Sequence, residues 1–361
     1  MGLAGGFREQ SRVDKLLRQL RQEAAGDYIL MEVCGGHTTA IQSYGIGGLL
    51  PGNIRLISGP GCPVCVTSRS YIDHAVGLSA IPGVIIATFG DLLRVPGSTD
   101  SLEKAKATGA DVRVVYSVNE AISMAEKERS KRIVFLAIGF ETTVPGTAAG
   151  VLSAAEKGLD NFLILSAQKI MPPAMRAVVE GGTEVNGFIC PGHVSTITGS
   201  GIYRFLTEES GIGCVVSGFE PVDILQSILM LVRQVNRNAP DVEVQYTRAV
   251  RPEGNRKALD IMNRVFGPSA EWWRGFGIIE GSGLQLRPQY ESIDARNILS
   301  AFAEEDPDEG ACICGEILRG RSTAGDCPLF GNGCTPDNPA GACMVSSEGA
   351  CYINYKYNKH G

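Results

Sequence analysis

The chain has 361 residues, which is long enough for two or three domains of ordinary size. Hydrophobic residues make up 44% of it and charged residues 20%, close to the globular average, so disordered, collagen-like and coiled-coil chains are excluded. Asp and Glu (39) outnumber Lys and Arg (33), and the resulting net charge of −6 predicts that nucleic acid is not a partner.

Neither the start of the chain nor any later segment has the composition of a membrane signal. Residues 1–23 lack the apolar segment of a signal peptide, and the longest apolar run, 133–138, is far too short to cross a bilayer. We therefore expect a cytoplasmic protein without membrane association. Thiols stay reduced in the cytosol, so the eleven cysteines favour metal or redox chemistry over structural disulfides.

The predicted elements alternate between short β-branched runs and amphipathic helices, after an isolated helix over 11–23. Most of the predicted strands are continuously apolar, as parallel strands covered on both faces are. This pattern predicts an α/β fold with parallel sheets. The predicted strands are 54–57, 84–88, 112–116, 133–138, 162–166, 187–190 and 214–217, and the predicted helices are 68–78, 117–128, 146–155, 172–180, 201–208, 221–236 and 253–266.

Changes in composition along the chain suggest three domains. A charged stretch near 126–132 divides two α/β domains, which we expect at 28–125 and 130–238. After residue 240 the alternation stops and a Gly-, Pro- and Cys-rich tail follows, so 240–361 is predicted to form a third, iron-sulfur domain. The helix within 1–25 has no strand beside it and is predicted to pack on this third domain.

Uncommon polar residues, glycines and cysteines follow the predicted strands. The carboxyl ends of parallel strands are where open α/β sheets bind ligands. We therefore expect one cleft lined by several of these turns, which are 31–39, 58–65, 89–91, 139–143, 166–169, 190–195 and 217–221.

Six cysteines lie in the last 50 residues of the chain. Cys312, Cys327, Cys334 and Cys351 are separated by 14, 6 and 16 residues, and their Gly- and Pro-rich loops could wrap a [4Fe-4S] cluster. Cys314 and Cys343 are alternative ligands. These intervals lack the paired knuckles of most structural zinc sites, so the cluster is preferred, with zinc and unliganded thiols as the competing interpretations.

Cys62 and Cys65 are separated by two residues in the sequence GPGCPVC. At a strand end that opens into a helix, such a pair can cycle between dithiol and disulfide. A single CxxC is moderately specific, and two inert thiols in a tight turn remain the alternative.

The remaining candidates are a cysteine, two histidines and a glutamate in glycine-containing turns. Cys34 precedes two glycines, which let a bulky group or a partner backbone approach the thiol, and His37 could orient a ligand or move protons. His37 and His193 could equally be hydrogen-bonded structural residues. Glu141 could be an acid/base group or could cap a helix. Nucleotide-binding loops, metalloprotease and nucleophile-elbow motifs are all absent from the sequence.

Taken together, the motifs resemble one known family. MEVCGGHT, SGPGCPVC, GFETT, PGHVSTITG, CPLFGNGCTP and GACMVSSEGAC run from residue 31 to about 357, and this set resembles the HypD family of [NiFe]-hydrogenase maturation factors. The resemblance implies a scaffold that assembles the Fe(CN)2CO group together with a small HypC-type chaperone and a HypE-type cyanide donor. It also implies two α/β domains and a third domain with a [4Fe-4S] cluster.

The resemblance also implies roles for individual residues. Cys34 would hold the iron with a cysteine of the chaperone, supported by His37, and Cys62 and Cys65 would be a redox pair beside it. Glu141, His193 and Glu348 would be polar residues near the site, without assigned roles. Two other functions are compatible with the residues alone: an iron-sulfur-linked disulfide reductase, and a zinc-stapled interaction protein without redox function.

Overall fold

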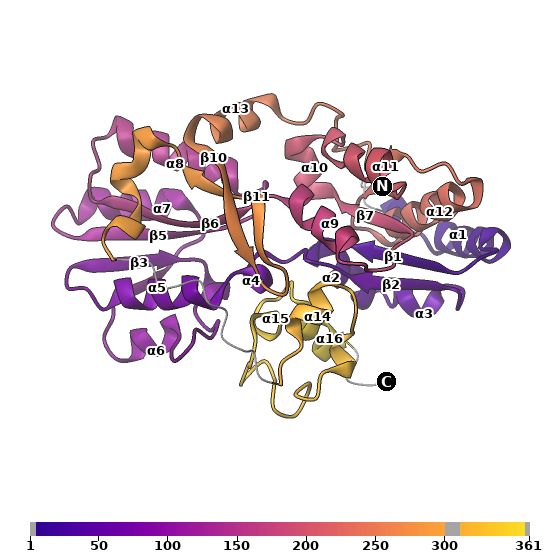
Figure 1. Ribbon diagram of the computed structural model, residues 1–361, viewed down its shortest axis with the longest axis horizontal. Helices are drawn as coiled ribbons and strands as arrows, with labels where there is room; N and C mark the ends of the chain where they lie inside the picture. Colours follow the sequence, from indigo (N-terminus) through magenta and orange to yellow (C-terminus); the bar gives the residue numbers. More distant parts are fainter. Residues whose placement is uncertain (1–4, 300–310, 358–361) are drawn as a thin grey trace.

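The computed structural model describes residues 5–299 and 311–357, which form two sheet regions and a Cys-rich segment below them (Figure 1). The predicted α/β fold with parallel sheets is confirmed. The first sheet has the strand order β2-β1-β7-β8-β9, and every pair in it is parallel. Its strands are β1 (Tyr28–Glu32), β2 (Ile54–Ser58), β7 (Gly187–Pro191), β8 (Gly213–Ser217) and β9 (Val242–Val244).

The second sheet has the order β10-β11-β6-β5-β3-β4 and is parallel except for β10 and β11, which form an antiparallel hairpin. Residues 84–88 and 133–139 are buried throughout, which explains why these strands read as continuous apolar runs. The strands are β3 (Val84–Thr88), β4 (Val112–Val114), β5 (Arg132–Gly139), β6 (Phe162–Lys169), β10 (Phe266–Trp273) and β11 (Gly277–Leu286).

The strands do not divide between the two sheets at the predicted domain boundary. Strands β1 and β2 belong to the first sheet, and the next four strands, β3 to β6, belong to the second. Strands β7, β8 and β9 then belong to the first sheet again. The boundaries 28–125 and 130–238 therefore do not separate the sheets. Apolar periodicity is a local signal that reveals a strand but not its neighbours, so the return crossing could not be read from it.

The helices cover both faces of the sheets, as expected for parallel α/β architecture (Figure 1). Those of the first sheet region are α1 (Gln10–Glu23), α2 (Gly35–Ser43), α3 (Ile46–Leu49), α10 (Gly192–Thr198), α11 (Arg204–Ser210) and α12 (Pro221–Arg237). The others before the tail are α4 (Pro63–Val66), α5 (Arg69–Ser79), α6 (Leu102–Ala107), α7 (Val118–Lys127), α8 (Val144–Glu156), α9 (Met171–Glu180) and α13 (Arg256–Val265).

Helix α1 packs against α12 of the first sheet region, and not against the Cys-rich segment as its isolation in the sequence suggests. Its apolar face buries Val13, Leu17 and Leu20. Arg233 of α12 also forms an ion pair with Glu23 at 2.7 Å. The spacing of apolar residues shows that a helix has a buried face, but it does not show which element covers that face.

The β10–β11 hairpin is not among the elements predicted from the sequence. In the structure it descends between the two sheet regions toward the Cys-rich segment (Figure 1). Trp272 and Trp273 end β10, and β11 pairs with β6 through Gly283 and Leu284. The hairpin therefore extends the second sheet toward the tail.

The Cys-rich segment, residues 311–357, contains three helices of four to eight residues: α14 (Cys314–Leu318), α15 (Ala342–Val345) and α16 (Ala350–Tyr357). It packs on the rest of the protein mainly through α16 against α2 and α15 against α4. None of the helices within the described residues is both long enough and apolar enough to span a bilayer.

Candidate functional site

A cavity of about 470 Å³ lies where the carboxyl ends of the two sheets and the Cys-rich segment meet. Four of the seven turns that were expected to line a cleft contribute to it, and they come from both sheets. The residues that line the cavity are Val33 and Cys34 after β1, Gly61 and Pro63 after β2, Gly139, Phe140, Thr142 and Thr143 at the end of β5, Pro191, His193, Val194, Thr196 and Ile197 after β7, and Glu348 of the tail. One site therefore draws on all three regions.

Cys34 lies on the wall of this cavity as the residue that precedes helix α2. The residue is half-buried. The pKa of the Cys34 thiol is raised to about 12, and burial is the main cause. The neighbouring carboxyl groups of Glu32 and Glu348 also raise this pKa, whereas the His37 and Gly36 amides lower it. At neutral pH the thiol is protonated, so a cation bound there would displace its proton.

Glu32, at the end of β1, is a buried carboxyl group that the sequence analysis overlooked. It accepts hydrogen bonds from the Cys34 amide (3.0 Å) and the Thr38 hydroxyl (2.5 Å), and burial raises its pKa to about 7. Glu32 thus ties the strand to the first turn of α2 and holds the backbone of Cys34. The signal that could have identified it is a charged residue at the end of the otherwise apolar strand YILME.

His37 lies behind Cys34 and does not line the cavity. Its Nε2 approaches the carbonyl oxygens of Ser217 (3.3 Å) and Gly218 (3.1 Å), which requires the proton on Nε2. Among the described residues its Nδ1 has no hydrogen-bond partner. Burial lowers the pKa of His37 to about 4, so the ring is neutral at physiological pH.

His193 is exposed in the cavity and is connected to His37 through one aromatic ring. Phe219 stacks on His37 with the ring centroids 4.6 Å apart and on His193 at 4.0 Å. Both histidines predicted from the sequence are thus brought to the same place, one as a buried support and one on the cavity wall.

Two glycines allow the backbone segments around Cys34 to approach closely. A Cβ on Gly61 would lie 2.2 Å from the Cys34 nitrogen, and a Cβ on Gly35 would lie 2.4 Å from the Cβ of Glu348. Glycine is therefore required at both positions by contact, and not by an unusual φ angle. Because of these contacts, the GPGC turn (residues 59–62) and the tail pack directly against the end of β1.

Cys62 and Cys65 are both buried, and the Cys65 amide donates to the Cys62 sulfur at 3.2 Å. Burial raises the pKa of Cys65, as do its hydrogen bonds to Cys343 and Cys62. The Cys62–Cys65 pair is therefore in contact with a tail cysteine 278 residues further along the chain (343 − 65). The sequence analysis had no means of detecting this contact.

The tail cysteines converge on Cys314 and Cys343. The sulfurs of Cys312 and Cys314 are 3.3 Å apart, and the thiols of Cys314, Cys351 and Cys65 hydrogen-bond to Cys343 and lower its pKa. The structure thus connects the redox candidates to the tail through Cys343, which the sequence analysis gave only as an alternative cluster ligand.

The chemistry of the tail fits an iron-sulfur cluster. Cys334 accepts the Ala340 amide at 3.3 Å, and it lies in the same tight loop as Cys327, where the Cys334 amide donates to Leu329. A Cβ on Gly341 would lie 2.8 Å from the Cys314 sulfur, so the backbone passes close to the thiols as in a cluster-binding loop. Within 5–299 and 311–357, no group of three or more Cys, His, Asp or Glu side chains is placed so that it could hold a single metal ion.

Glu141 lies beside the cavity, but its side chain is buried. One carboxylate oxygen accepts the Met171 amide at 3.0 Å, whereas the other has no partner among the described residues. Burial raises the pKa of Glu141 to about 7. Through this hydrogen bond Glu141 connects the GFETT turn to Met171, the first residue of α9.

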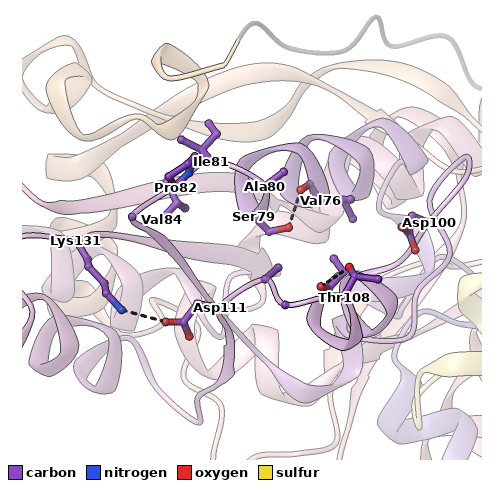
Figure 2. Close-up of a pocket in the computed structure, with 14 residues that line it drawn as sticks. Val76, Ser79, Ala80, Ile81, Pro82, Val84, Asp100, Thr108, Asp111 and Lys131 are labelled. Atoms are coloured by element: carbon purple, nitrogen blue, oxygen red, sulfur yellow. Dashed lines mark hydrogen bonds and ion pairs between the residues drawn. The ribbon is translucent and has the colours of Figure 1, made fainter.

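A second cavity, of about 490 Å³, lies at the opposite end of the second sheet (Figure 2). Its lining includes Val84, the first residue of β3, and Asp111, which precedes β4 and pairs with Lys131 at 3.4 Å. The lining contains no cysteine or histidine, and it lies at the amino ends of the strands. The chemistry-bearing residues are therefore concentrated in the first cavity.

Comparison with known proteins identifies the family of the chain. The family model "HypD: Hydrogenase formation hypA family" matches residues 11–358. The chain is 46% identical to hydrogenase maturation factor HypD2 of Bradyrhizobium diazoefficiens, covering 99% of this chain and 97% of the relative. It is 46% identical to hydrogenase expression/formation protein HupD of Azotobacter chroococcum (98% and 96%) and 44% identical to hydrogenase maturation factor HypD of Cupriavidus necator (98% and 96%). The chain belongs to the HypD family.

Proposed function

We propose that this protein acts in hydrogenase maturation as a scaffold and redox protein on which the Fe(CN)2CO group is assembled. The observation that carries the proposal is Cys34, a thiol on the wall of a cavity shared by both sheets and the tail. The relatives are named as hydrogenase maturation factors. Family membership and this cavity together support an assembly site.

Cys34 would bind the iron that is being modified. Soft thiolate suits low-spin iron that carries cyanide and carbon monoxide, and a cysteine of a HypC-type chaperone would complete the site. Binding of the iron replaces the proton on the Cys34 sulfur. Glu32 holds the Cys34 amide while this happens, so the sulfur keeps its place at the cavity wall.

The cavity wall opposite the tail would orient the cargo. His193 is exposed there, and the Phe219 ring between it and His37 keeps its imidazole in place. Burial lowers the pKa of His193, so a neutral ring on the cavity wall can face anionic cyanide. The pKa of His37 is also lowered by burial, and this histidine supports the site from behind Cys34. A HypE-type donor would deliver cyanide through this opening.

Cys312, Cys327, Cys334 and Cys351 would hold a [4Fe-4S] cluster, with Cys314 and Cys343 as alternative ligands. When bound, such a cluster supplies one-electron redox chemistry at the tail. The Cys62–Cys65 pair would exchange two electrons and two protons as it changes between disulfide and dithiol. The contact of Cys65 with Cys343 supports electron transfer between the tail and the Cys62–Cys65 pair.

The same contact also favours a second function, an iron-sulfur-linked disulfide reductase. Such an enzyme would use Cys62 and Cys65 on an external disulfide and would not need Cys34. Infrared spectroscopy separates the two, because only the scaffold carries cyanide and carbon monoxide on iron. Iron and acid-labile sulfide analysis after anaerobic purification would distinguish both from a zinc-stapled interaction protein.

The deciding experiment replaces Cys34 by serine in the protein purified anaerobically with its small chaperone. We expect Cys34→Ser to keep its tail iron and sulfide, because the two sites use different cysteines, and to lose the cyanide and carbon monoxide infrared bands. Cys214→Ala, at a buried cysteine of β8 outside the cavity, is the matched control and should keep the bands. Bands of wild-type intensity in Cys34→Ser would overturn the assignment.

A further inference from the structure

The tip of the β10–β11 hairpin lies between the CPVC turn and the Cys-rich segment (Figure 1). At this tip the Arg274 amide donates to the Val66 carbonyl at 3.1 Å. On the other side, a Cβ on Gly275 would lie 2.6 Å from the Cα of Gly315, the residue after Cys314. Gly275 also has a φ of +82°, so both its conformation and its contact require glycine.

The Arg274 side chain continues this attachment to the CPVC turn. Its guanidinium Nε donates to the Cys65 carbonyl at 3.1 Å, and its Nη2 donates to the Thr67 carbonyl at 3.1 Å. Together with its backbone amide, Arg274 binds three consecutive carbonyl oxygens, those of residues 65, 66 and 67. These are carbonyls at the end of a four-residue helix, which has no following turn to satisfy them.

The hairpin tip is itself firmly held by the second sheet. The Trp273 indole donates to the Ser282 hydroxyl at 2.8 Å, and its ring stacks on Phe140, which lines the cavity. Arg274 is 1% exposed and Trp273 is fully buried. The CPVC turn (residues 62–65) is thus hydrogen-bonded to a buried and well-packed hairpin tip, and not to an exposed loop.

We propose that Arg274 is a positioning residue for the Cys62–Cys65 pair. The donors of its guanidinium group and its backbone amide keep the CPVC turn in the conformation that places the two sulfurs side by side. The proposal rests on the redox role assigned to this pair above. Oxidation removes two electrons and two protons from the thiols and forms one S–S bond, with the electrons passing to an oxidised dithiol reagent. A clamped turn raises the effective concentration of one thiol at the other and so stabilises the disulfide.

The experiment measures the equilibrium between Cys62–Cys65 and dithiothreitol buffers of known ratio, by anaerobic thiol labelling and mass spectrometry of the full protein. We expect Arg274→Met to reduce the equilibrium constant for disulfide formation at least tenfold, which is a shift of about +30 mV. Arg274→Lys should recover less than half of that shift in mV, because one ammonium cannot reproduce a fork directed at two carbonyls. A change below twofold in Arg274→Met, or full recovery in Arg274→Lys, overturns the proposal.

Two further variants keep the test decisive. Arg113→Met removes an arginine from the Asp111 and Glu128 ion pairs at the other end of the second sheet and should keep the wild-type constant. If Arg274→Met does not fold, Ser282→Ala loosens the same tip by removing the partner of Trp273, and it should lower the constant at least twofold. An unchanged constant in Ser282→Ala contradicts the proposal.

The two hypotheses fail in different ways. If Cys62 and Cys65 form no reversible disulfide in the wild-type protein, the proposed redox function is wrong. If they do so in wild type and equally in the Arg274 and Ser282 variants, only the role of Arg274 is wrong.

Discussion

The end of β1 and the Cys-rich segment both present cysteines to the same part of the molecule, but they are built differently. Cys34 follows a central strand that pairs with β2 and β7, and Glu32 and α2 hold its backbone. The Cys-rich segment has three helices of at most eight residues, and its buried thiols contact one another. At the end of β1 regular backbone pairing holds the loop, so the Cys34 thiol is free to serve chemistry alone. In the Cys-rich segment, which has little regular secondary structure, we expect bonds between thiolates and a metal to stabilise the fold as well.

Replacing a tail cysteine is the strongest test of this comparison. Cys334→Ala should lose iron and most of its soluble yield, because thiolate-metal bonds would connect a segment with little regular structure of its own. Iron content and yield after anaerobic purification measure the effect, with Cys34→Ser as the control that keeps both. Full iron content in Cys334→Ala would remove this residue from the ligand set, and Cys327→Ala tests its neighbour in the same way.

Disrupting the backbone contact that holds Cys34 should have a different effect. It should lower the free energy of unfolding but leave the iron content of the tail unchanged. In Gly61→Ala the new Cβ meets the backbone of Val33 and Cys34, so either the turn or the strand end must move, at a cost of about 3 kcal/mol. Urea unfolding measures the loss of unfolding free energy. Gly52→Ala is the matched control, because a Cβ added at this glycine would have no atom within 4 Å. A stable Gly61→Ala protein would mean that this contact does not constrain the site.

A smaller, pH-dependent effect should come from Glu141, whose pKa burial raises to about 7 from its ordinary value of 4.5. Between these values the unfolded chain loses the proton while the folded protein keeps it, so stability falls as pH rises from 4.5 to 7 and stays level above. Glu141→Gln should remove this part of the slope, at most about 3 kcal/mol.

Denaturant unfolding from pH 4.5 to 8 tests the prediction, with Glu103→Gln on the exposed face of α6 as control. Glu32 has a similarly raised pKa, so part of the slope should remain in the variant. Identical profiles for wild type and Glu141→Gln would show that the Glu141 carboxyl titrates normally in the folded protein.

Much of the local structure was readable from the sequence. The strands over 84–88, 133–138 and 214–217 were predicted because residues buried on both faces leave continuous apolar runs, and the structure contains all three. The turns bearing Cys34, Gly61 and His193 were identified because they follow predicted parallel strands, whose carboxyl ends bind ligands in open α/β sheets, and because they carry cysteine, histidine and glycine. Glu32 was missed because a single carboxyl group at a strand end does not reveal that it binds the next turn.

The sequence by itself determined the fold class, the cysteine groups and the family, because each depends on residue type and local spacing. Only the tertiary structure decided which strands share a sheet, that Cys65 meets Cys343, and that Arg274 binds the CPVC turn. These contacts join segments more than 150 residues apart in the chain: 187 − 28 = 159 for the start of β7 and β1, and 274 − 65 = 209 for Arg274 and Cys65. Such pairings follow from the packing of the whole chain, and local periodicity carries no record of them.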